Sequence, residues 1–473
     1  MKFYRSLIIV SIILPFFFGC SASYKDKLEK SEKYFYSGDY VNAIDDVRGL
    51  YKDSAAKDRL LYLMEAGVIF HTKGDYKKSN VVFKQADEIA ERIKISISKQ
   101  ALSFFLSDRE KNFRGENFER VLIKFYIALN YIMLGDYRKA RIYFKKLNYD
   151  LKVMKYTEGK YKQNVAARYL NAVLSEYFQE YNSARVEYKN ISMIDPGYKE
   201  ILGDKFVLAV KAGDDEDIKK YKTGEKYIEC YDNNLKRVSY NTNMGELIVI
   251  HEAGKAAIKV SRGRLLDDRM FAKALRAAIT IALHSKGAAI STSSVIAMLG
   301  TAENPIPVYK KRDLQGEHPI NLFLNSKNIG KTRVVTDYSM TAIKNFNENY
   351  SKYVAKNITS IATKIVIAAI AANEASKRAE KASGNNVLVG SLGRFIIGAS
   401  AGGIVAASVK PDLRCWHLLP SNFQIKRVFL EPGEYNLNIE FMHNRNAFVS
   451  SFPEKIVIEK GKPLFVNFRS FTL

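Results

Sequence analysis

The chain has 473 residues, which is too long for one hydrophobic core and predicts two or three domains. Its 47% hydrophobic and 26% charged residues are typical of a folded protein and exclude a disordered one. The net charge of +24 would suit a nucleic-acid or anionic-membrane surface, but basic and acidic residues alternate, as in "KDKLEKSEK". No nucleic acid is therefore expected as a partner, whereas peptidoglycan and anionic lipid stay open.

Residues 1–19 are predicted to be a secretory signal peptide. Lys2 and Arg5 precede an apolar run that is shorter than the roughly 20 residues needed to cross a bilayer. The following "FFGC" resembles a lipobox, the site where bacterial lipoprotein precursors are cleaved and acylated on cysteine. We expect a mature chain that starts at Cys20 and is held in a membrane by its acyl chains. Ser21, in place of an aspartate, favours the outer membrane by the same resemblance; the alternative is an ordinary signal peptide with an incidental cysteine.

Residues 20–212 contain a repeat, visible in "SGDYVNAI", "KGDYKKSNVVF", "LGDYRKARIYF" and "FQEYNSARVEY". Each copy has a turn, an aromatic residue shortly after it, and one small residue on either side. Small residues that face each other let two helices approach closely, so each copy predicts a helical hairpin that stacks on its neighbours. The pattern resembles the tetratricopeptide repeat (TPR). The expected packing positions are Gly67, Tyr76, Ala128, Tyr137, Ala140, Ala172, Tyr181 and Ala184.

Two roles are open for this array of hairpins. A concave surface could bind a peptide or a partner protein, as helical repeats often do. The array could equally be a spacer or a packing platform for the rest of the chain. No residue in the array predicts catalysis.

Residues 213–410 are predicted to form a mixed α+β domain. The polar stretch after Gly213 is expected to be a linker, and "GELIVIHEAGKAAIKV" predicts two strands joined by a turn at "EAGK". "DDRMFAKALRAAITIALHSKG" fits a helix or a strand. Residues 338–383 predict one long helix, because apolar residues recur at spacings near three and four. The apolar segment 387–409 is expected to pack against that helix, since Arg394 leaves too short a run for a bilayer; membrane insertion is the alternative.

Residues 411–473 are predicted to be β-structure. "FQIKRVFLEPGEYNLNIEFM" has the pattern of a strand, a turn at Pro432 and Gly433, and a second strand, and "EKIVIEKGKPLFVNF" repeats it. A small antiparallel sheet or sandwich follows. The expected fold class is therefore α+β and multidomain, with an N-terminal TPR-like α-solenoid and a mixed α+β domain that ends in antiparallel β-strands.

No enzyme signature is present. None of the six histidines stands at metal-ligand spacing with another histidine or a cysteine, and no phosphate loop or nucleophile elbow occurs. We therefore predict no catalytic residue, no metal and no cofactor. In "PDLRCWHLLP", Asp412, Arg414 and Trp416 are expected to form a buried corner. The favoured role is structural, and the alternative is a polar ligand cleft shared with His251.

Two cysteines remain once Cys20 carries lipid. Cys230 and Cys415 are an even number in an oxidising compartment, so a disulfide between them is one alternative. Two separate thiols are the other.

Four stretches carry a family resemblance. "RGENFERVLIKFYIALNYIMLGDYRKARI", "GELIVIHEAGKAAIKV", "NPIPVY" and "DLRCWHLLPSNFQIKRVFLEPGEYNL", in this order, resemble an uncharacterised family of bacterial TPR-containing outer-membrane lipoproteins. Ala256 and Ala257 depart from that family, which usually has a proline and further positive charge there. The resemblance implies the architecture and a lipid-anchored location at the outer membrane, on its periplasmic face. It carries over no catalytic residue.

The function expected from the sequence is a protein-interaction scaffold or accessory factor in envelope assembly, with unidentified envelope proteins as partners. One alternative is a C-terminal domain that binds a cell-wall fragment or small ligand, with or without enzymatic activity. Another is a pilotin-like factor of a secretion or pilus system.

Overall fold

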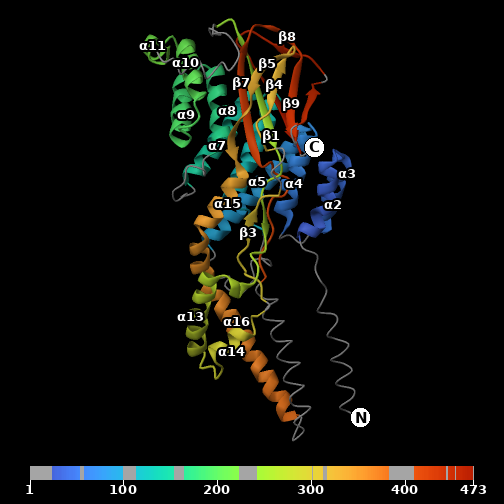
Figure 1. The fold of residues 1–473 in the computed structure, drawn as a ribbon, viewed down its shortest axis with the longest axis vertical. Coiled ribbons are helices and arrows are strands. Elements are labelled where there is room, and N and C mark those ends of the chain that lie inside the picture. The colour runs from blue at the N-terminus through green and yellow to red at the C-terminus, as the bar shows by residue number, and fades with distance from the viewer. Residues whose placement is uncertain are drawn as a thin grey trace.

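The structure is a computed structural model, and it describes residues 24–53, 58–99, 113–153, 164–222, 242–300, 302–312, 317–382, 410–443, 446–452 and 454–471. Four of the sequence predictions lie outside the described residues: the signal peptide, the lipidation site at Cys20 with Ser21, Cys230, and segment 387–409. The described chain is α+β, with helices in its N-terminal half and sheets nearer its C-terminus. Figure 1 shows a body of helices and sheets from which helices α13, α14 and α16 project.

Consecutive helices of the N-terminal half pair as hairpins. The pairs are α2 (Tyr24–Tyr36) with α3 (Tyr40–Asp53), α4 (Arg59–Thr72) with α5 (Tyr76–Lys99), α6 (Asn117–Met133) with α7 (Tyr137–Val153), α8 (Val165–Tyr177) with α9 (Tyr181–Ile194), and α10 (Ile201–Ala212) with α11 (Asp215–Lys222). The first four pairs are the predicted copies. The linker predicted after Gly213 is wrong for α11, which completes a fifth hairpin.

The turns of the hairpins share one backbone geometry. Gly74 and Gly135 have φ of +86° and +74°, in the left-handed region where a side chain is unfavourable, and Gln179 has +59°. An acidic residue follows and starts the next helix, as where the carboxylate of Asp75 accepts the N–H of Lys78 at 3.2 Å. Gly213, with φ of +66°, repeats the pattern, and this is why the polar residues after it are helical.

The small residues predicted to lie between paired helices are buried. In the first helices they are Ser31, Gly67, Ala128 and Ala172, and in the second helices Ala43, Ser79, Ala140 and Ala184. The predicted aromatic positions Tyr76, Tyr137 and Tyr181 begin the second helices and are half-buried. The alignment of the copies therefore places these residues correctly in the hairpins.

Two four-stranded sheets follow the hairpins. The first has the order β12 (Pro463–Ser470), β1 (Gly245–Ala253), β7 (Asn422–Leu430), β6 (Arg333–Asp337), and the second has the order β10 (Asn446–Ser451), β9 (Leu437–His443), β4 (Asn321–Leu324), β5 (Lys327–Lys331). Two short pairs join β11 (Ile456–Ile458) to β8 (Gly433–Tyr435) and β2 (Ile258–Val260) to β3 (Val308–Lys310). Leu247 and Val428 of the first sheet share a core with Leu322 and Ile439 of the second, so the sheets pack face to face.

Three predictions of strand pairing are wrong. Strands β7 and β9, expected to form a hairpin across Pro432 and Gly433, belong to different sheets. The strand expected to fold back on β1 after "EAGK" pairs with β3 instead. The chain does not end in purely antiparallel strands, because β12 runs parallel to β1. All nine residues of β1 are buried, so β1 is a central strand covered on both faces. The sequence predictions paired each strand with its neighbour along the chain and therefore missed this central position.

The predicted domain limits do not coincide with the boundaries of the hairpins and sheets. The limit at residue 212 falls in the turn of the fifth hairpin. The first sheet takes β1 and β6 from the predicted range 213–410, and β7 and β12 from the predicted range 411–473. The two C-terminal ranges therefore build one sheet together.

The projecting part contains α13 (Arg269–Ser285) and α14 (Thr292–Ala297), which follow a short 3-10 turn (Leu265–Asp267), together with α15 (Tyr338–Glu348) and α16 (Tyr350–Ala382). The ambiguous stretch after Asp268 is helix α13, and its buried residues recur every four positions from Phe271. The single helix predicted over 338–383 is interrupted at Asn349. That residue ends α15, and its side-chain amide donates to the carbonyl of Asn345 at 2.8 Å, a local bond to the backbone that suits asparagine at a helix end. Its own carbonyl accepts the N–H of Tyr353 at 2.9 Å as the next helix begins.

One stretch of the described residues has the length and apolar composition to cross a membrane. It is Asn357–Ala375 in α16, with a mean hydropathy of 1.4. Only 22% of it is buried inside the structure. Among the described elements, α13, α14 and α15 contact α16 and cover part of its surface.

Gly67→Ala tests the packing of the second hairpin. A Cβ at this position would lie 2.5 Å from Cε1 of Phe83, so the ring would have to move. We expect Gly67→Ala to lower the free energy of unfolding by roughly 1 to 3 kcal/mol relative to Gly49→Ala. Gly49 is the matched control, because it is also helical and its Cβ would meet nothing within 4 Å. Chemical unfolding of both variants gives the comparison, and equal stabilities would contradict the close approach of α4 and α5.

Candidate functional site

The inner face of the hairpins contacts the C-terminal half of the chain. We define the inner face as the sides of α2, α4, α6, α8 and α10 that carry five acidic residues, Glu32, Glu65, Glu119, Glu176 and Asp204. Ile248 and Ile250 of β1 and Phe423 and Ile425 of β7 belong to the same hydrophobic core as the hairpins. The hairpins therefore cover the face of the first sheet that the second sheet leaves free.

An extended segment lies against this inner face. The inner segment, residues 411–421, forms no helix or strand, and most of its residues are buried. Glu119 Oε1 accepts the N–H of Trp416 at 2.8 Å. Glu65 accepts the N–H of His417 on Oε1 at 2.7 Å and the N–H of Leu418 on Oε2 at 2.9 Å. Two carboxylates thus satisfy three consecutive backbone donors, as a protein does when it binds an extended peptide.

Ion pairs fix the same segment at its sides. Arg414 donates to both carboxylate oxygens of Asp412, at 2.9 and 2.7 Å, and to Asp58 at 2.7 Å. The imidazole Nδ1 of His417 lies 2.9 Å from Glu32 Oε1. Burial raises the pKa of the Glu32 carboxyl, but the hydrogen bonds and charges of His417 and Arg312 together outweigh it, so this pKa is lowered. These pairs connect the inner segment to the first and second hairpins.

Of the residues predicted to form a buried corner, Arg414 pairs with Asp412, whereas Trp416 packs elsewhere. The Trp416 ring is 1% exposed and lies 5.9 Å from the rings of both Phe83 and Tyr126. Trp416 therefore lies within the hydrophobic core of the hairpins, and Asp412 is only half-buried.

His251 does not join that corner. On β1, Ile250 faces the hairpins, whereas His251 faces the second sheet and its ring stacks on Phe468 at 4.7 Å. Its nitrogens lie 3.1 Å from Gln424 Oε1 and 2.6 Å from Ser470 Oγ. Burial lowers the pKa of His251 to about 4, so the ring is neutral near pH 7. A cleft shared by His251 and Trp416 is therefore wrong, because the sheet separates them.

The carboxyls of the inner face have unusual pKa values. Burial raises the pKa of Glu65 to about 8, although the N–H groups of His417 and Leu418 lower it in part. Burial likewise raises the pKa of Glu119 to about 7, partly offset by the charge of Lys259. Both side chains therefore bind a proton in a pH range where an exposed glutamate is ionised.

A second polar cluster ties the hairpins to β1. Glu252 Oε1 lies 2.7 Å from His71 Nε2, and Glu252 Oε2 accepts the hydroxyl of Tyr126 at 2.7 Å and Arg469 Nη1 at 3.4 Å. Burial would raise the pKa of Glu252, but the charge and hydrogen bond of His71 lower it to about 2. Both side chains are fully buried, so the pair cannot reach a substrate without unfolding and acts in structure.

The third cluster surrounds Arg427 of β7. Its guanidinium donates to Glu246 at 3.0 and 2.6 Å and to Glu176 at 3.0 and 2.7 Å. It also donates to Asp204 at 3.1 Å. Lys211 reaches the same two glutamates, at 2.6 Å from Glu176 and 2.5 Å from Glu246. The fourth and fifth hairpins are thus connected to β1 and β7 by buried charges.

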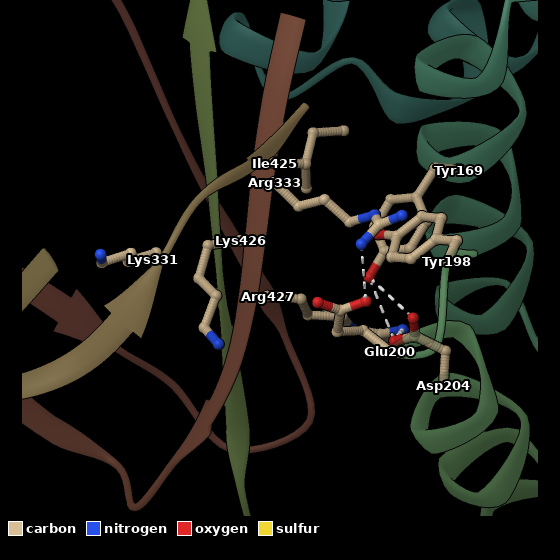
Figure 2. Close-up of a pocket in the computed structure, with 9 residues that line it drawn as sticks. All are labelled: Tyr169, Tyr198, Glu200, Asp204, Lys331, Arg333, Ile425, Lys426 and Arg427. Carbon is tan, nitrogen blue, oxygen red and sulfur yellow. Dashed lines mark hydrogen bonds and ion pairs between the residues drawn. The ribbon is translucent and has the colours of Figure 1, made fainter. Parts of the chain in front are cut away.

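An open cleft of about 40 Å³ lies beside this cluster, between α10 and strands β5, β6 and β7. Figure 2 shows Tyr198 and Asp204 from the helical side facing Arg333 and Arg427, whereas Lys331 and Lys426 lie apart from them. Arg333 lies 4.7 Å from the centre of the Tyr198 ring and pairs with Asp195 at 3.2 Å. The volume holds a few water molecules or one small anionic group.

The remaining candidate residues give no reactive site. Burial raises the pKa of Cys415 to about 12, and its sulfur accepts the N–H of Lys259 at 3.3 Å. Pairing with Cys230 stays a prediction, because Cys230 lies outside the described residues. In the part of the chain that the structure describes, no group of histidine, cysteine, aspartate and glutamate side chains is suited to hold a metal.

Sequence reasoning missed the acidic residues of the inner face. Glu65 interrupts "RLLYLMEAGVIF" and Glu176 follows "AARYLNAVLS", so each is an acid in a largely apolar helix. Acidic residues are rarely buried without a partner, so an acid within an apolar helix indicates a buried hydrogen bond or ion pair. Three of their partners, His417, Leu418 and Arg427, could not be found from the sequence, because they lie in the last quarter of the chain.

No family model matches the chain, and no curated protein matches it. Function must therefore be inferred from the residues of the chain itself. The arrangement of the inner face suits the binding of an extended backbone, and residues of the same chain occupy it.

Arg427→Met tests the charged cluster. The variant removes the guanidinium from three buried acids, Glu176, Glu246 and Asp204, of which Lys211 contacts only the two glutamates. We therefore expect a loss of roughly 3 to 5 kcal/mol in the free energy of unfolding. Arg333→Met is the control, because Arg333 is 31% exposed and its pairs should contribute at most about 1 kcal/mol. Urea unfolding measures both. A loss for Arg427→Met as small as that of the control would show that the cluster is not needed for stability.

The pH dependence of stability tests Glu65. Its pKa is raised on folding, so its contribution is complete below the unfolded pKa near 4.5 and is lost as the pH rises through about 8. From pH 6.5 to 8 the free energy of unfolding should decrease by at most about 2 kcal/mol through this group, and the melting temperature should fall with it. Glu65→Gln should flatten the curve. Exposed Glu29→Gln is the control, and equal slopes for the two variants would refute the assignment.

Proposed function

We propose that this chain is a lipid-anchored scaffold or accessory protein of the bacterial outer membrane, facing the periplasm. The proposal has three parts: a TPR-like helical array, a lipid anchor at Cys20, and a role in binding other envelope proteins. Each part has separate support.

The shared geometry of the hairpins supports the TPR-like array. Turns with a left-handed residue, followed by an acidic residue that starts the next helix, recur in successive hairpins, and small residues lie between the paired helices. Side chains also bridge neighbouring hairpins, as where Asn148 of α7 donates to Glu187 of α9 at 2.9 Å. Stacked hairpins of this kind form solenoids.

The occupied inner face is the observation that carries the scaffold role. Because the inner segment and the first sheet fill the side on which a solenoid usually binds its peptide, the array and the sheets form one rigid unit. A partner would therefore meet the outer helices, the second sheet or the projecting helices.

The envelope location is supported by the chain's sequence. The apolar N-terminal run, the lipobox-like "FFGC" and Ser21 indicate an acylated cysteine sorted to the outer membrane. The resemblance to TPR-containing lipoproteins points to the same place.

One observation favours a second function, the binding of a small ligand. The cleft beside Arg427 is lined by the basic residues Lys331, Arg333 and Lys426, which suit a carboxylate or phosphate, and also by the acidic residues Glu200 and Asp204. Its small volume restricts the ligand to such a group or to the end of a larger molecule. A cell-wall fragment held by a terminal carboxylate is the form of this alternative that the cleft permits.

Cys20→Ala tests the anchor. We expect the substitution to abolish both the incorporation of labelled palmitate and the cleavage before residue 20, because the thiol is the acylated group. Cys230→Ala should keep both. Ser21→Asp should retain acylation but move the protein from the outer to the inner membrane on density-gradient fractionation. Palmitate-free wild-type protein would refute the anchor.

Cross-linking in intact cells tests the scaffold role. Mass spectrometry of the wild-type and Cys20→Ala cross-links should reveal defined envelope proteins that depend on the anchor. Bound glycan or lipid without any protein would favour the ligand-binding alternative.

A further inference from the structure

Exposed apolar residues recur at one position of the second helices. Val81, Ile142 and Val186 each lie seven residues after the turn residue of their hairpin, and their side chains are 58%, 52% and 58% exposed. Two turns further along, Tyr149 and Met193 are 66% and 56% exposed. Equivalent positions of stacked hairpins lie side by side, so these residues form rows across α5, α7 and α9. We call this surface the outer face.

Lysines recur with the same period. Lys84, Lys145 and Lys189 each lie three residues after the exposed aliphatic residue of their helix, and therefore on the same side of it. Lys84 donates to the hydroxyl of Tyr131 at 2.8 Å, and the other two are exposed. Among the exposed residues in the described parts of α5, α7 and α9, the acidic one is Glu88. The outer face thus alternates apolar and positively charged side chains.

The helices that carry the outer face are fixed beside one another. Lys124 of α6 donates to Asp87 of α5 at 2.7 Å and lies 2.9 Å from Asp150 of α7. Arg141 of α7 pairs with Glu180 at the start of α9. The rows are therefore held in place before any partner arrives, and in Figure 1 α9 lies at the outer edge of the body.

We propose that the outer face binds the surface of an anionic lipid bilayer. The contact centres of protein interfaces are depleted of lysine, whereas lysines among aliphatic side chains suit the headgroup region, where the amine meets phosphate and the apolar group enters the acyl boundary. The chain's net charge of +24, which falls by two when Lys2 and Arg5 leave with the predicted signal peptide, adds a long-range attraction to such a surface. This inference rests on the proposed function in that the lipid anchor at Cys20 holds the protein beside a bilayer.

The contact can be measured with the acylated full-length protein in vesicles. Tyr149→Trp places an indole on the outer face, and brominated acyl chains quench tryptophan that enters the acyl boundary. We expect quenching of this tryptophan in vesicles of phosphatidylethanolamine and phosphatidylglycerol, and its loss in phosphatidylcholine or at high salt. The native Trp416 is 1% exposed and gives the background. Val457→Trp, at a 54% exposed site on β11, is the position control and should stay unquenched.

Charge variants separate the outer face from the total charge. One variant combines Lys145→Glu, Lys146→Glu and Lys189→Glu, three exposed lysines of α7 and α9. The fraction of molecules whose outer face contacts the bilayer, measured by quenching, should fall roughly 10- to 100-fold, as expected for the loss of several surface lysines. Lys310→Glu, Lys327→Glu and Lys455→Glu change the net charge equally on exposed sites of the strand region and should leave quenching unchanged.

Three outcomes would overturn the inference: no quenching in anionic vesicles, equal loss with both charge variants, or equal quenching in neutral vesicles. In each case the protein would still co-sediment with the vesicles through its acyl chains, so the proposed anchor would stand. Protein that carries no acyl group and stays in the supernatant would instead refute the anchor. If no quenching is observed, an acidic protein becomes the favoured partner of the outer face.

Discussion

Buried carboxylates on the first helices of the hairpins are the constraint on which the remaining structure depends. Glu65 and Glu119 would be costly in a hydrophobic core without donors, and the inner segment supplies those donors from its backbone. The inner segment in turn has no strand partner and would expose its own N–H groups without the glutamates. Each side therefore satisfies groups that the other would leave unpaired.

This mutual dependence explains why the domain limits suggested by the sequence do not separate independent units. Glu65 meets a residue 353 positions later, and Arg427 reaches Glu176 from 251 positions away. The first sheet likewise takes its central strand from the middle of the chain and both of that strand's neighbours from the end. The hairpins can form locally, but their inner face is complete only when the last residues have folded onto it.

The sequence predicted those features that depend on neighbouring residues. The turns at Gly74 and Gly135 and the buried small residues such as Ala140 follow from a local repeat, and the pairing of Arg414 with Asp412 follows from their closeness in the sequence. It did not predict which strands pair, because pairing is decided by distant segments. For the same reason it left open a cleft shared by His251 and Trp416, although alternation along β1 directs His251 to the opposite face of the sheet.

The outer face shows what a repeat can encode beyond its own packing. Small residues such as Ala140 and Ala184 recur because two helices must approach, and any stacked hairpin needs them. Packing gives no comparable reason for an exposed aliphatic residue to recur in step with a lysine, since Ile142 and Val186 leave about half of their surface in water. With the inner face filled by the chain itself, the periodic exposed positions are where a stacked array can still present a regular surface to its surroundings.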